Sequence, residues 1–534
     1  MSGGSRRTRG GEDAAMNPNL AARLSERAAL HPDRPALVAG RGAGRRVVSF
    51  GKLDARVGRV AARLHARGIT AGERVLIFVP MSIELYVALL AVLRLGAVAV
   101  FVDAWAGRRR LDAAVAAARP AAFLGTPRAH LLRLASRALR AIPRQLWVGR
   151  DFGAGGPGAP QAAVADVDAG AHALVTFTTG STGRPKAAAR SHAFLWAQRL
   201  VLARHLGLEE TDVDMPTLPV FVLHDLATGC TCVLPDFDPR RPGAIDARAI
   251  LAQMRDEGVT TCSASPSFFD ALLAGDLGPA GALPVRALFT GGAPVLPALA
   301  RRLAALAGTV AHVVYGGTEA EPIASIPAAE LVAALDAPEP GLCAGRPVGE
   351  ITLKLVRAHD GPLDLGARGW AEWEVAPGET GEIVVTGEHV LPGYLDDPAS
   401  DRENKVREGA RTWHRTGDAG RLDSSGRLWL MGRVKHRLER DGRVTWPLPV
   451  ELAALRVAGV SHAAWIGVPG PGGRSRAVLC VETPGHAPDE AALRAAVDPS
   501  PVDEVVAFDR IPRDPRHASK TDTAALVRLL AGPR

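Results

Sequence analysis

The densest chemical signal in the sequence lies directly after the apolar run ALVTFT, residues 173–178. Hydroxyl residues, glycines and a lysine are concentrated at the end of this run and in the positions that follow it. The pattern is typical of a loop wrapped around an anion, and its residues are Thr178, Thr179, Gly180, Ser181, Thr182, Gly183 and Lys186. The loop is not a P-loop, because Pro185 precedes the lysine and Ala187 follows it. We predict a phosphate-binding loop; the alternative is a Gly/Ser surface turn.

Further short motifs follow in chain order. They are Gly291-Gly292-Ala293-Pro294, Tyr315-Gly316-Gly317-Thr318-Glu319, the segment HRTGD that ends at Asp418, Gly432-Arg433, and Lys520 in RHASK. Each alone has an ordinary alternative, such as a strand followed by a turn, a helix cap or a solvated basic loop. Only six residues are lysine, so the two lysines that fall inside motifs carry weight as compact point charges.

Taken together, the order and spacing of these motifs resemble the adenylate-forming superfamily of acyl-CoA synthetases, peptide-synthetase adenylation domains and luciferase. The resemblance implies activation of a carboxylic acid by ATP to an acyl-AMP, with release of pyrophosphate. The carboxylate and the phosphate are both anionic, so cations and hydrogen-bond donors must neutralise their approach. ATP and Mg²⁺ are the small molecules that this chemistry implies.

The resemblance also assigns roles along the motifs. The loop hydroxyls and Lys186 hold the leaving phosphates, and the turn formed by Gly291, Gly292 and Ala293 lines the adenine pocket. Within the YGGTE motif, Tyr315 stacks on adenine, Thr318 contacts phosphate beside Gly316 and Gly317, and Glu319 holds Mg²⁺. Asp418 binds the ribose hydroxyls, Arg433 lies near the ribose at a hinge, and Lys520 is the mobile lysine that reaches the α-phosphate.

The chain departs from the usual acyl-CoA synthetase pattern at several positions. Two cations of the turn after the hinge are replaced by Glu439 and Asp441, whose charge would oppose CoA. The gate segment 219–222 lacks its usual histidine, although His224 lies two residues on, and Ser519 replaces the glycine before the mobile lysine. A lone histidine in an apolar run is more often structural than catalytic.

These departures resemble one branch of the superfamily, the β-lactone synthetases of bacterial long-chain olefin biosynthesis. The resemblance extends over PVFVLHDLATG, YGGTEAEPIASI, GRLWLMGRVKHR and RHASK. It implies adenylation of a 2-alkyl-3-hydroxy fatty acid, whose own 3-hydroxyl then closes a lactone and expels AMP. His224 is a candidate base for that hydroxyl. The alternatives are a ligase that passes the acyl group to CoA, a carrier protein or an amine, a catalytically silent binding protein, and a phosphotransferase.

The elements that position these motifs alternate through most of the chain. Short apolar runs separated by helical stretches predict parallel strands covered on both faces. From about residue 342, alternating strands with turns predict a β-barrel-like subdomain, and a small α+β segment follows residue 432. We predict an α/β protein with a disordered leader over 1–15, a large ATP- and acyl-binding domain over 16–432, and a small mobile domain over 433–534 that carries Lys520.

Composition excludes other classes of protein. Residues of the apolar types make up 47% and charged residues 22%, as in a soluble globular protein. The net charge of +8 includes a basic leader with no recognition module behind it, so we expect no nucleic-acid partner. Five scattered cysteines predict buried thiols in a cytoplasmic protein. The apolar stretch 87–102 predicts a buried helix and strand rather than a membrane span. Assembly with neighbouring pathway enzymes is open.

Overall fold

The computed structural model describes residues 17–102, 107–149, 152, 158–179, 185–238, 241–277, 282–337, 339–470, 475–514 and 520–531. The predicted leader lies outside these residues, as do Gly180, Ser181, Thr182, Gly183 and Ser519. The chain forms two compact units. The first comprises Met1–Val38, Val47–Leu200 and Leu223–Thr231, and the second Ala39–Arg46, Val201–Val222 and Cys232–Arg534. Five elements contain a point of division: β1 (Pro35–Ala39), β2 (Arg46–Ser49), α7 (His192–Leu206), α8 (Pro219–Thr228) and β10 (Thr231–Leu234).

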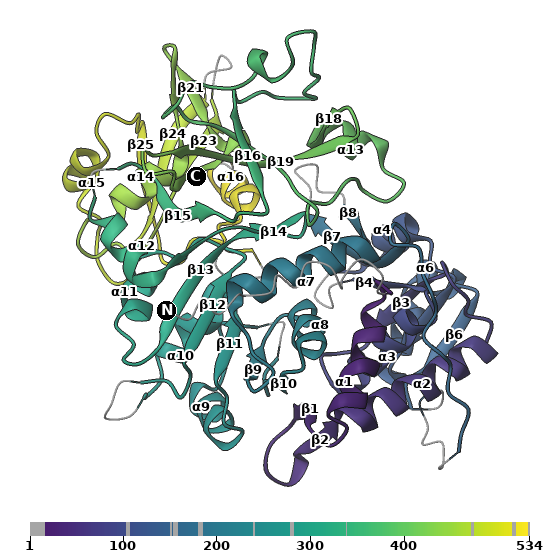
Figure 1. Cartoon of the computed structure of the whole chain (residues 1–534). Helices are drawn as coiled ribbons and strands as arrows, with labels where there is room; N and C mark the ends of the chain where they lie inside the picture. Colours follow the sequence, from purple (N-terminus) through teal and green to yellow (C-terminus); the bar gives the residue numbers. More distant parts are fainter. Residues whose placement is uncertain are drawn as a thin grey trace, which may run out of the picture. The chain divides into compact units, whose positions relative to one another are not determined.

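The first unit is built on a sheet in the order β6-β5-β3-β4-β7-β8 (Figure 1). The strands up to β7 are parallel, as the apolar runs predict, and β8 returns antiparallel to β7. The stretch 87–102 is a buried helix that leads into a buried strand, as predicted. The elements are α1 (Leu20–Leu30), α2 (Phe50–Ala66), β3 (Arg74–Phe78), α3 (Ile83–Arg94), β4 (Val98–Phe101), α4 (Arg108–Ala118), β5 (Ala122–Gly125), α5 (Pro127–Ala135), α6 (Arg137–Ala141), β6 (Arg144–Trp147), β7 (His172–Thr179) and β8 (Pro185–Ser191).

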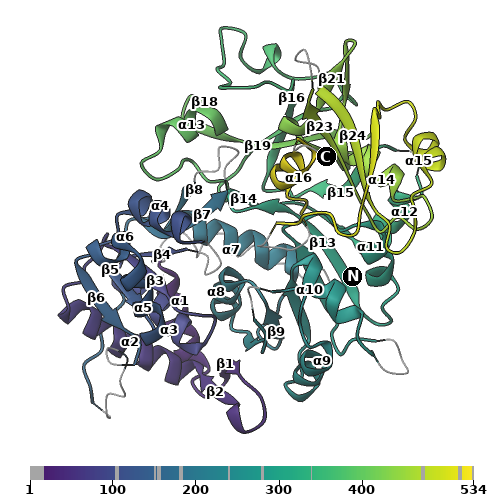
Figure 2. The same ribbon diagram turned by 180° about the vertical axis from the view of Figure 1, so that it is seen from behind.

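The second unit contains a larger sheet in the order β16-β17-β19-β20-β15-β14-β13-β12-β11-β9. Figure 2 labels six of these strands, β9, β13, β14, β15, β16 and β19. Strands β9, β11, β12 and β13 are parallel, and from β14 onward the pairing is antiparallel. The change therefore begins at residue 320, one strand earlier than the predicted position near residue 342, because β14 folds back on β13 directly after the YGGTE motif. The elements are β9 (Val213–Pro216), α9 (Ala247–Asp256), β11 (Thr261–Ala264), α10 (Pro266–Leu273), β12 (Ala287–Gly291), α11 (Pro297–Ala304), β13 (Val310–Gly317), β14 (Ala320–Pro327), α12 (Ala328–Leu335), β15 (Leu342–Pro347), β16 (Thr352–Val356), β17 (Gly381–Thr386), α13 (Pro398–Asn404), β18 (Lys405–Glu408), β19 (Arg411–Leu422) and β20 (Leu428–Arg433).

The C-terminal part of the second unit has its own three-stranded sheet, β23-β24-β25. Successive side chains of β23 alternate between two apolar clusters, with Trp465 in one and Ile466 in the other, because strand residues point to opposite faces. The elements are β21 (Leu438–Arg440), β22 (Arg443–Thr445), α14 (Pro447–Ala454), β23 (His462–Pro469), β24 (Ser475–Glu482), α15 (Glu490–Val497), β25 (Glu504–Phe508) and α16 (Thr523–Ala531). That this part moves as a domain about residue 433 stays a prediction.

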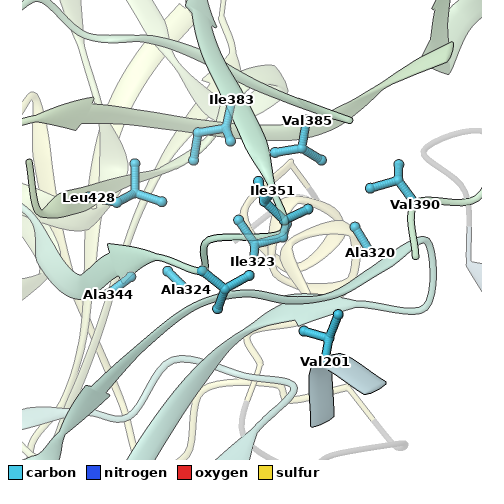
Figure 3. Packing of buried hydrophobic residues seen from close by; sticks show 11 residues of the cluster. Val201, Ala320, Ile323, Ala324, Ala344, Ile351, Ile383, Val385, Val390 and Leu428 are labelled. Carbon is cyan, nitrogen blue, oxygen red and sulfur yellow. The ribbon is translucent and has the colours of Figure 1, made fainter. Parts of the chain in front are cut away.

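One apolar cluster of the second unit joins the strands that carry the motifs. Figure 3 shows Ala320, Ile323 and Ala324 of β14 facing Ile383 and Val385 of β17. Tyr315 of β13 packs against the same cluster. Burial of these aliphatic side chains holds β13 and β14 in place relative to β17 and β20, and it thereby fixes the spacing between the YGGTE and TGD motifs.

The cysteines match the sequence-based expectation. All five cysteines are buried free thiols: Cys230, Cys232, Cys262, Cys343 and Cys480. Among the described residues, no helix combines the length and the apolar character that crossing a bilayer requires.

Candidate functional site

Three motif residues that are far apart in the chain meet in the second unit. The Tyr315 hydroxyl donates to Oδ2 of Asp418 over 2.9 Å, and Nε of Arg433 lies 3.1 Å from Oδ1 of the same carboxylate. Burial and the Asp418 charge raise the pKa of Tyr315 well above its usual value, so the phenol remains a donor at neutral pH. The resemblance assigned all three residues to the nucleoside, and the structure brings them together.

A bulge in β19 positions Asp418. Arg415 pairs with Val384 of β17 and Ala419 pairs with Glu382, so residues 416–418 lie opposite a single residue, Ile383. The Thr416 hydroxyl closes this bulge, since it donates to the Ile383 carbonyl over 2.9 Å and accepts from the Asp418 amide over 3.1 Å. Gly417, which lies between Thr416 and Asp418, has φ of +69°, a backbone conformation that residues with a Cβ disfavour. The TGD sequence thus encodes a specific backbone shape.

A buried ion pair fixes the strand just before the bulge. Nε and a terminal nitrogen of Arg415 lie 3.0 and 2.6 Å from Oε2 of Glu382, and the two side chains are only 7% and 3% exposed. Arg415 also donates to the backbone carbonyls of His359, Gly361 and Glu403. Burial raises the pKa of Glu382 despite its cationic partner. Removal of either partner would leave a buried charge unpaired, which is strongly destabilising.

The YGGTE turn places Glu319 at the link between β13 and β14. Oε1 of Glu319 accepts a 2.9 Å hydrogen bond from the Tyr394 hydroxyl, and its backbone carbonyl accepts from the Leu391 amide over 2.7 Å. Burial and the Glu319 charge raise the pKa of Tyr394. Gly316 is required here, because a Cβ on it would lie 2.8 Å from the Ala320 carbonyl oxygen.

Tyr394 was not predicted from the sequence. The chain has three tyrosines, and the same scarcity that favoured Tyr315 could have indicated Tyr394 as well. Two of the three tyrosines therefore donate a hydrogen bond to a motif carboxylate.

The predicted adenine turn lies at the end of β12. A Cβ on Gly291 would lie 2.6 Å from the Val314 carbonyl oxygen, and Gly292 has φ of +84°. The first position thus needs glycine for the close approach of β13, and the second needs it for the backbone conformation. Ala293 follows directly.

The segment after the predicted hinge forms a small hairpin. Gly432 has φ of +111°, and a Cβ on it would lie 2.6 Å from the Pro447 ring. Asp441 and Gly442 both have positive φ, which is typical of a type I′ turn between β21 and β22. Arg437 makes two 3.0 Å contacts with Asp360 and one of 2.8 Å with Glu439. The negative charge that we expected to oppose CoA at position 439 is therefore partly balanced by Arg437.

Lys520 lies at the base of a loop on the C-terminal sheet. Its carbonyl accepts from the Asp514 amide over 2.7 Å, and Thr521 forms a bridge with Arg513. Arg513 in turn lies 3.0 Å from Glu482 of β24. Residues 513 and 514 are thus held against Lys520 and Thr521.

In the first unit, the predicted phosphate loop connects two antiparallel strands. Thr178 of β7 is paired with Lys186 of β8, and Thr179 with Pro185; Lys186 is buried. Nothing is described for the side chain of Thr179 or for residues 180–184. A P-loop leads from a strand into a helix, so this strand–loop–strand connection agrees with the sequence-based exclusion of that motif.

His224 lies on α8 in the first unit and is buried. Neither ring nitrogen has a hydrogen-bond partner among the described residues. Burial and the nearby Arg199 charge lower the pKa of His224 to about 3, so the ring is neutral at physiological pH. An unpartnered buried imidazole can accept a hydrogen bond from a substrate hydroxyl, but its low pKa makes it a weak base.

A small apolar cavity in the second unit lies beside the strands that carry the adenine motifs. Its lining includes Phe289 of β12 and Val314 of β13, with Leu202, His205, Leu206, His312, Pro322 and Ser325 completing it. The rings of Phe289 and His312 are stacked 5.5 Å apart. The cavity offers apolar contact but holds none of the motif carboxylates.

Comparison with known proteins indicates the same family as the motifs do. A family model described as AMP-binding enzyme matches residues 24–395. Two relatives named olefin beta-lactone synthetase, from Stenotrophomonas maltophilia and Xanthomonas campestris, are 35% and 34% identical, over 90% and 94% of this chain and 90% and 95% of their own lengths. The ATP-bound structure of MatB from Rhodopseudomonas palustris matches with a TM-score of 0.79 and 26% identity, over 96% of this chain and 99% of that one. The amide bond synthetase McbA from Marinactinospora thermotolerans matches with a TM-score of 0.78 and 24% identity, over 97% and 100%.

Proposed function

We propose that this chain, which belongs to the AMP-binding enzyme family, adenylates a 2-alkyl-3-hydroxy fatty acid and then closes the product to a β-lactone. It is an AMP-forming ligase with the fold of adenylate-forming enzymes, and ATP-dependent activation of a carboxylic acid is the reaction of that class. The lactone step rests on its similarity to the two olefin β-lactone synthetases over nearly the whole chain.

The observation that carries the adenylation step is the cluster around Asp418. This carboxylate is held by the Thr416 bulge, accepts a hydrogen bond from Tyr315, and pairs with Arg433. A fixed carboxylate with two oxygens can accept hydrogen bonds from two vicinal ribose hydroxyls. We assign it to the ribose, and we assign Tyr315 with Gly291, Gly292 and Ala293 to the adenine.

Glu319 fits the requirements of Mg²⁺. Magnesium is usually bound in proteins by one or two carboxylates together with substrate phosphates, and Glu319 supplies such a carboxylate, oriented by the 2.9 Å hydrogen bond that its Oε1 accepts from the Tyr394 hydroxyl. When bound, Mg²⁺ would offset the charge of the phosphate oxygens. Thr318, beside Gly316 and Gly317, would contact the same phosphates.

The first chemical step joins the acid to AMP. A carboxylate oxygen attacks the α-phosphorus, the bond from that phosphorus to the bridging oxygen breaks, and pyrophosphate leaves with the electron pair. Lys186 and the loop residues Thr178, Thr179, Gly180, Ser181, Thr182 and Gly183 would hold the leaving phosphates. Lys520 would stabilise the charge that develops around the α-phosphorus.

The second step needs no external acceptor. The 3-hydroxyl oxygen attacks the acyl carbon, the anhydride bond to phosphate breaks, and AMP leaves with that electron pair while the proton of the hydroxyl passes to the departing phosphate. Tethering of nucleophile and electrophile in one molecule supplies a high effective concentration. His224 is the residue that we assign to the hydroxyl, as a neutral hydrogen-bond acceptor rather than a strong base.

The test is mass spectrometry of the products formed from ATP, Mg²⁺ and each of two matched acids, with and without CoA. One acid is a 2-alkyl-3-hydroxy acid, and its control lacks only the 3-hydroxyl. We expect the hydroxy acid to give AMP and a CoA-independent product one water lighter, with a four-membered ring confirmed by NMR. The control acid should stop at acyl-AMP. Formation of an acyl-CoA from the hydroxy acid, with no lactone, would refute the lactone step and leave the adenylation step standing.

A further inference from the structure

A segment of the first unit concentrates positive charge on its surface. Residues 107–149 contain nine arginines and a single acidic residue, Asp112, so the net charge of this short segment equals the +8 of the whole chain. The segment forms α4, α5, α6 and the strands β5 and β6. Elsewhere in the chain, acidic and basic residues are nearly balanced.

Helix α5 presents an apolar face to solvent in the middle of this segment. Leu131 and Leu134 are 63% and 76% exposed, and Leu132 is 40% exposed. Arg128, Leu131 and Leu132 follow the spacing i, i+3 and i+4 that places residues on one side of a helix. The opposite side is anchored, because His130 is buried, stacks on Trp147 at 3.6 Å and contacts the Leu146 carbonyl over 2.9 Å. The leucines therefore cannot turn inward without loss of that packing.

The charges around this helix are available at the surface. Arg108, Arg109 and Arg110 form the exposed first turn of α4, and Arg137 is exposed at the start of α6. Within the part of the chain that the structure describes, none of these four makes an ion pair, and neither does Arg128.

Asp112, the one acidic residue of this segment, contacts a neighbouring helix of the same segment. The Ser136 hydroxyl, which also caps α6, donates to Asp112 of α4. Arg108 and Arg109 precede Asp112 by four and three residues, so they lie on the side of α4 that faces Ser136, one helical turn further along. Both views of the ribbon show α4 and α6 next to one another (Figures 1 and 2). Arginines and leucines thus share one surface, which we call the α5 surface: Arg108, Arg109, Arg110, Arg128, Leu131, Leu134 and Arg137.

We propose that the α5 surface docks this protein on the surface of an anionic lipid bilayer. Arginines complement acidic headgroups, and a helix with exposed leucines between basic residues lies in the interface with its apolar side chains among the acyl chains. A nucleic acid would match the charge but would leave the leucines in water.

The experiment is sedimentation of the full chain with vesicles of phosphatidylcholine, with or without phosphatidylglycerol. We expect binding only to the anionic vesicles, and weaker binding at high salt because salt screens the arginines. Each arginine beside an anionic surface is worth about a fivefold gain in binding. The variant Arg108→Gln/Arg128→Gln/Arg137→Gln should therefore bind at least tenfold more weakly.

Matched variants separate the lipid surface from a general effect of charge. Leu131→Ser/Leu134→Ser should also weaken binding severalfold, because the acyl-chain contact is lost. Arg248→Gln/Arg255→Gln on α9, and Leu30→Ser at another exposed leucine, should bind as the parent does. All of these positions are exposed, and thermal melting checks that each variant is folded.

Three outcomes would overturn the proposal. The first is equal binding to neutral and anionic vesicles, or no binding to either. The second is an equal loss of binding in the α9 control. The third is tight binding to an RNA oligonucleotide together with vesicle binding that is insensitive to the leucine substitutions, which would identify a polyanion site instead.

Discussion

Replacement of Thr416 by valine tests how the fold positions the proposed ribose carboxylate. The substitution keeps the shape of the side chain and removes its hydroxyl. That hydroxyl donates to the Ile383 carbonyl over 2.9 Å and accepts from the Asp418 amide over 3.1 Å. Both backbone groups would lose their side-chain partner inside the bulge.

The magnitude follows from these two contacts. A neutral hydrogen bond contributes about 1 kcal/mol net, and more is lost when its partner remains buried and unpaired. We expect Thr416→Val to lower the free energy of unfolding by about 2 kcal/mol. A hydrogen bond to a charged group is worth about 1.5–3 kcal/mol, so partial displacement of Asp418 should weaken ATP binding about tenfold.

Calorimetric titration of ATP with Mg²⁺, in the absence of acid, measures the affinity, and urea unfolding measures the stability. Thr416→Ser retains the hydroxyl and should bind ATP as the parent does. Thr386→Val is the matched control, because the Thr386 hydroxyl donates to the Thr412 carbonyl over 2.8 Å on the same pair of strands but away from the bulge. It should lose stability and keep its ATP affinity. Unchanged ATP affinity in Thr416→Val would refute the positioning role of the hydroxyl.

Three further predictions concern charge. Lys520→Ala should abolish acyl-AMP formation and leave ATP binding nearly intact; normal pyrophosphate release by this variant would exclude the proposed role. Burial raises the pKa of Glu451 to about 7, so its contribution to stability is complete below pH 4.5 and is lost as pH rises through 7. Urea unfolding of Glu451→Gln should therefore show a gain of about 1–2 kcal/mol over the parent at pH 8 and little difference at pH 4.5. In the unfolded chain His224 becomes protonated below about pH 6.5, whereas in the folded chain it stays neutral. The free energy of unfolding of the parent should therefore fall by about 2 kcal/mol between pH 7.5 and 5 through this residue. His224→Phe should remove that loss, and an unaltered pH profile would contradict the assigned burial of a neutral ring.

Much of the fold follows from local patterns in the sequence. The buried runs that become β3, β4, β7, β11 and β12 are recognisable because a strand covered on both faces is apolar throughout. The antiparallel character of the later strands was also visible, since turns and alternating residues replace helices beyond residue 342, but the first antiparallel strand, β14, was missed. Motif residues at the ends of these strands could be identified as well, because the apolar run before them shows where each strand stops.

The site contacts between distant segments could not be read from the sequence. Tyr394 reaches Glu319 across 75 positions, and Arg415 reaches Glu382 across 33. Neither pair has a local pattern, because a tyrosine or an arginine in a strand looks the same whether its partner is protein or water. Likewise, the charge of Glu439 is evident from its residue type, but only the fold places Arg437 where it balances part of that charge.

The sequence by itself therefore determined which chemical groups are present and, through their spacing, the class of reaction. The tertiary structure decided which of these groups are paired, buried or turned outward. The reason is physical: a charge or a hydrogen bond acts over a few ångströms, and those distances are set by packing between strands that lie far apart in the chain. The α5 surface shows the same division, since its arginines are evident in the sequence but the exposure of its leucines depends on His130 and the strand beneath it.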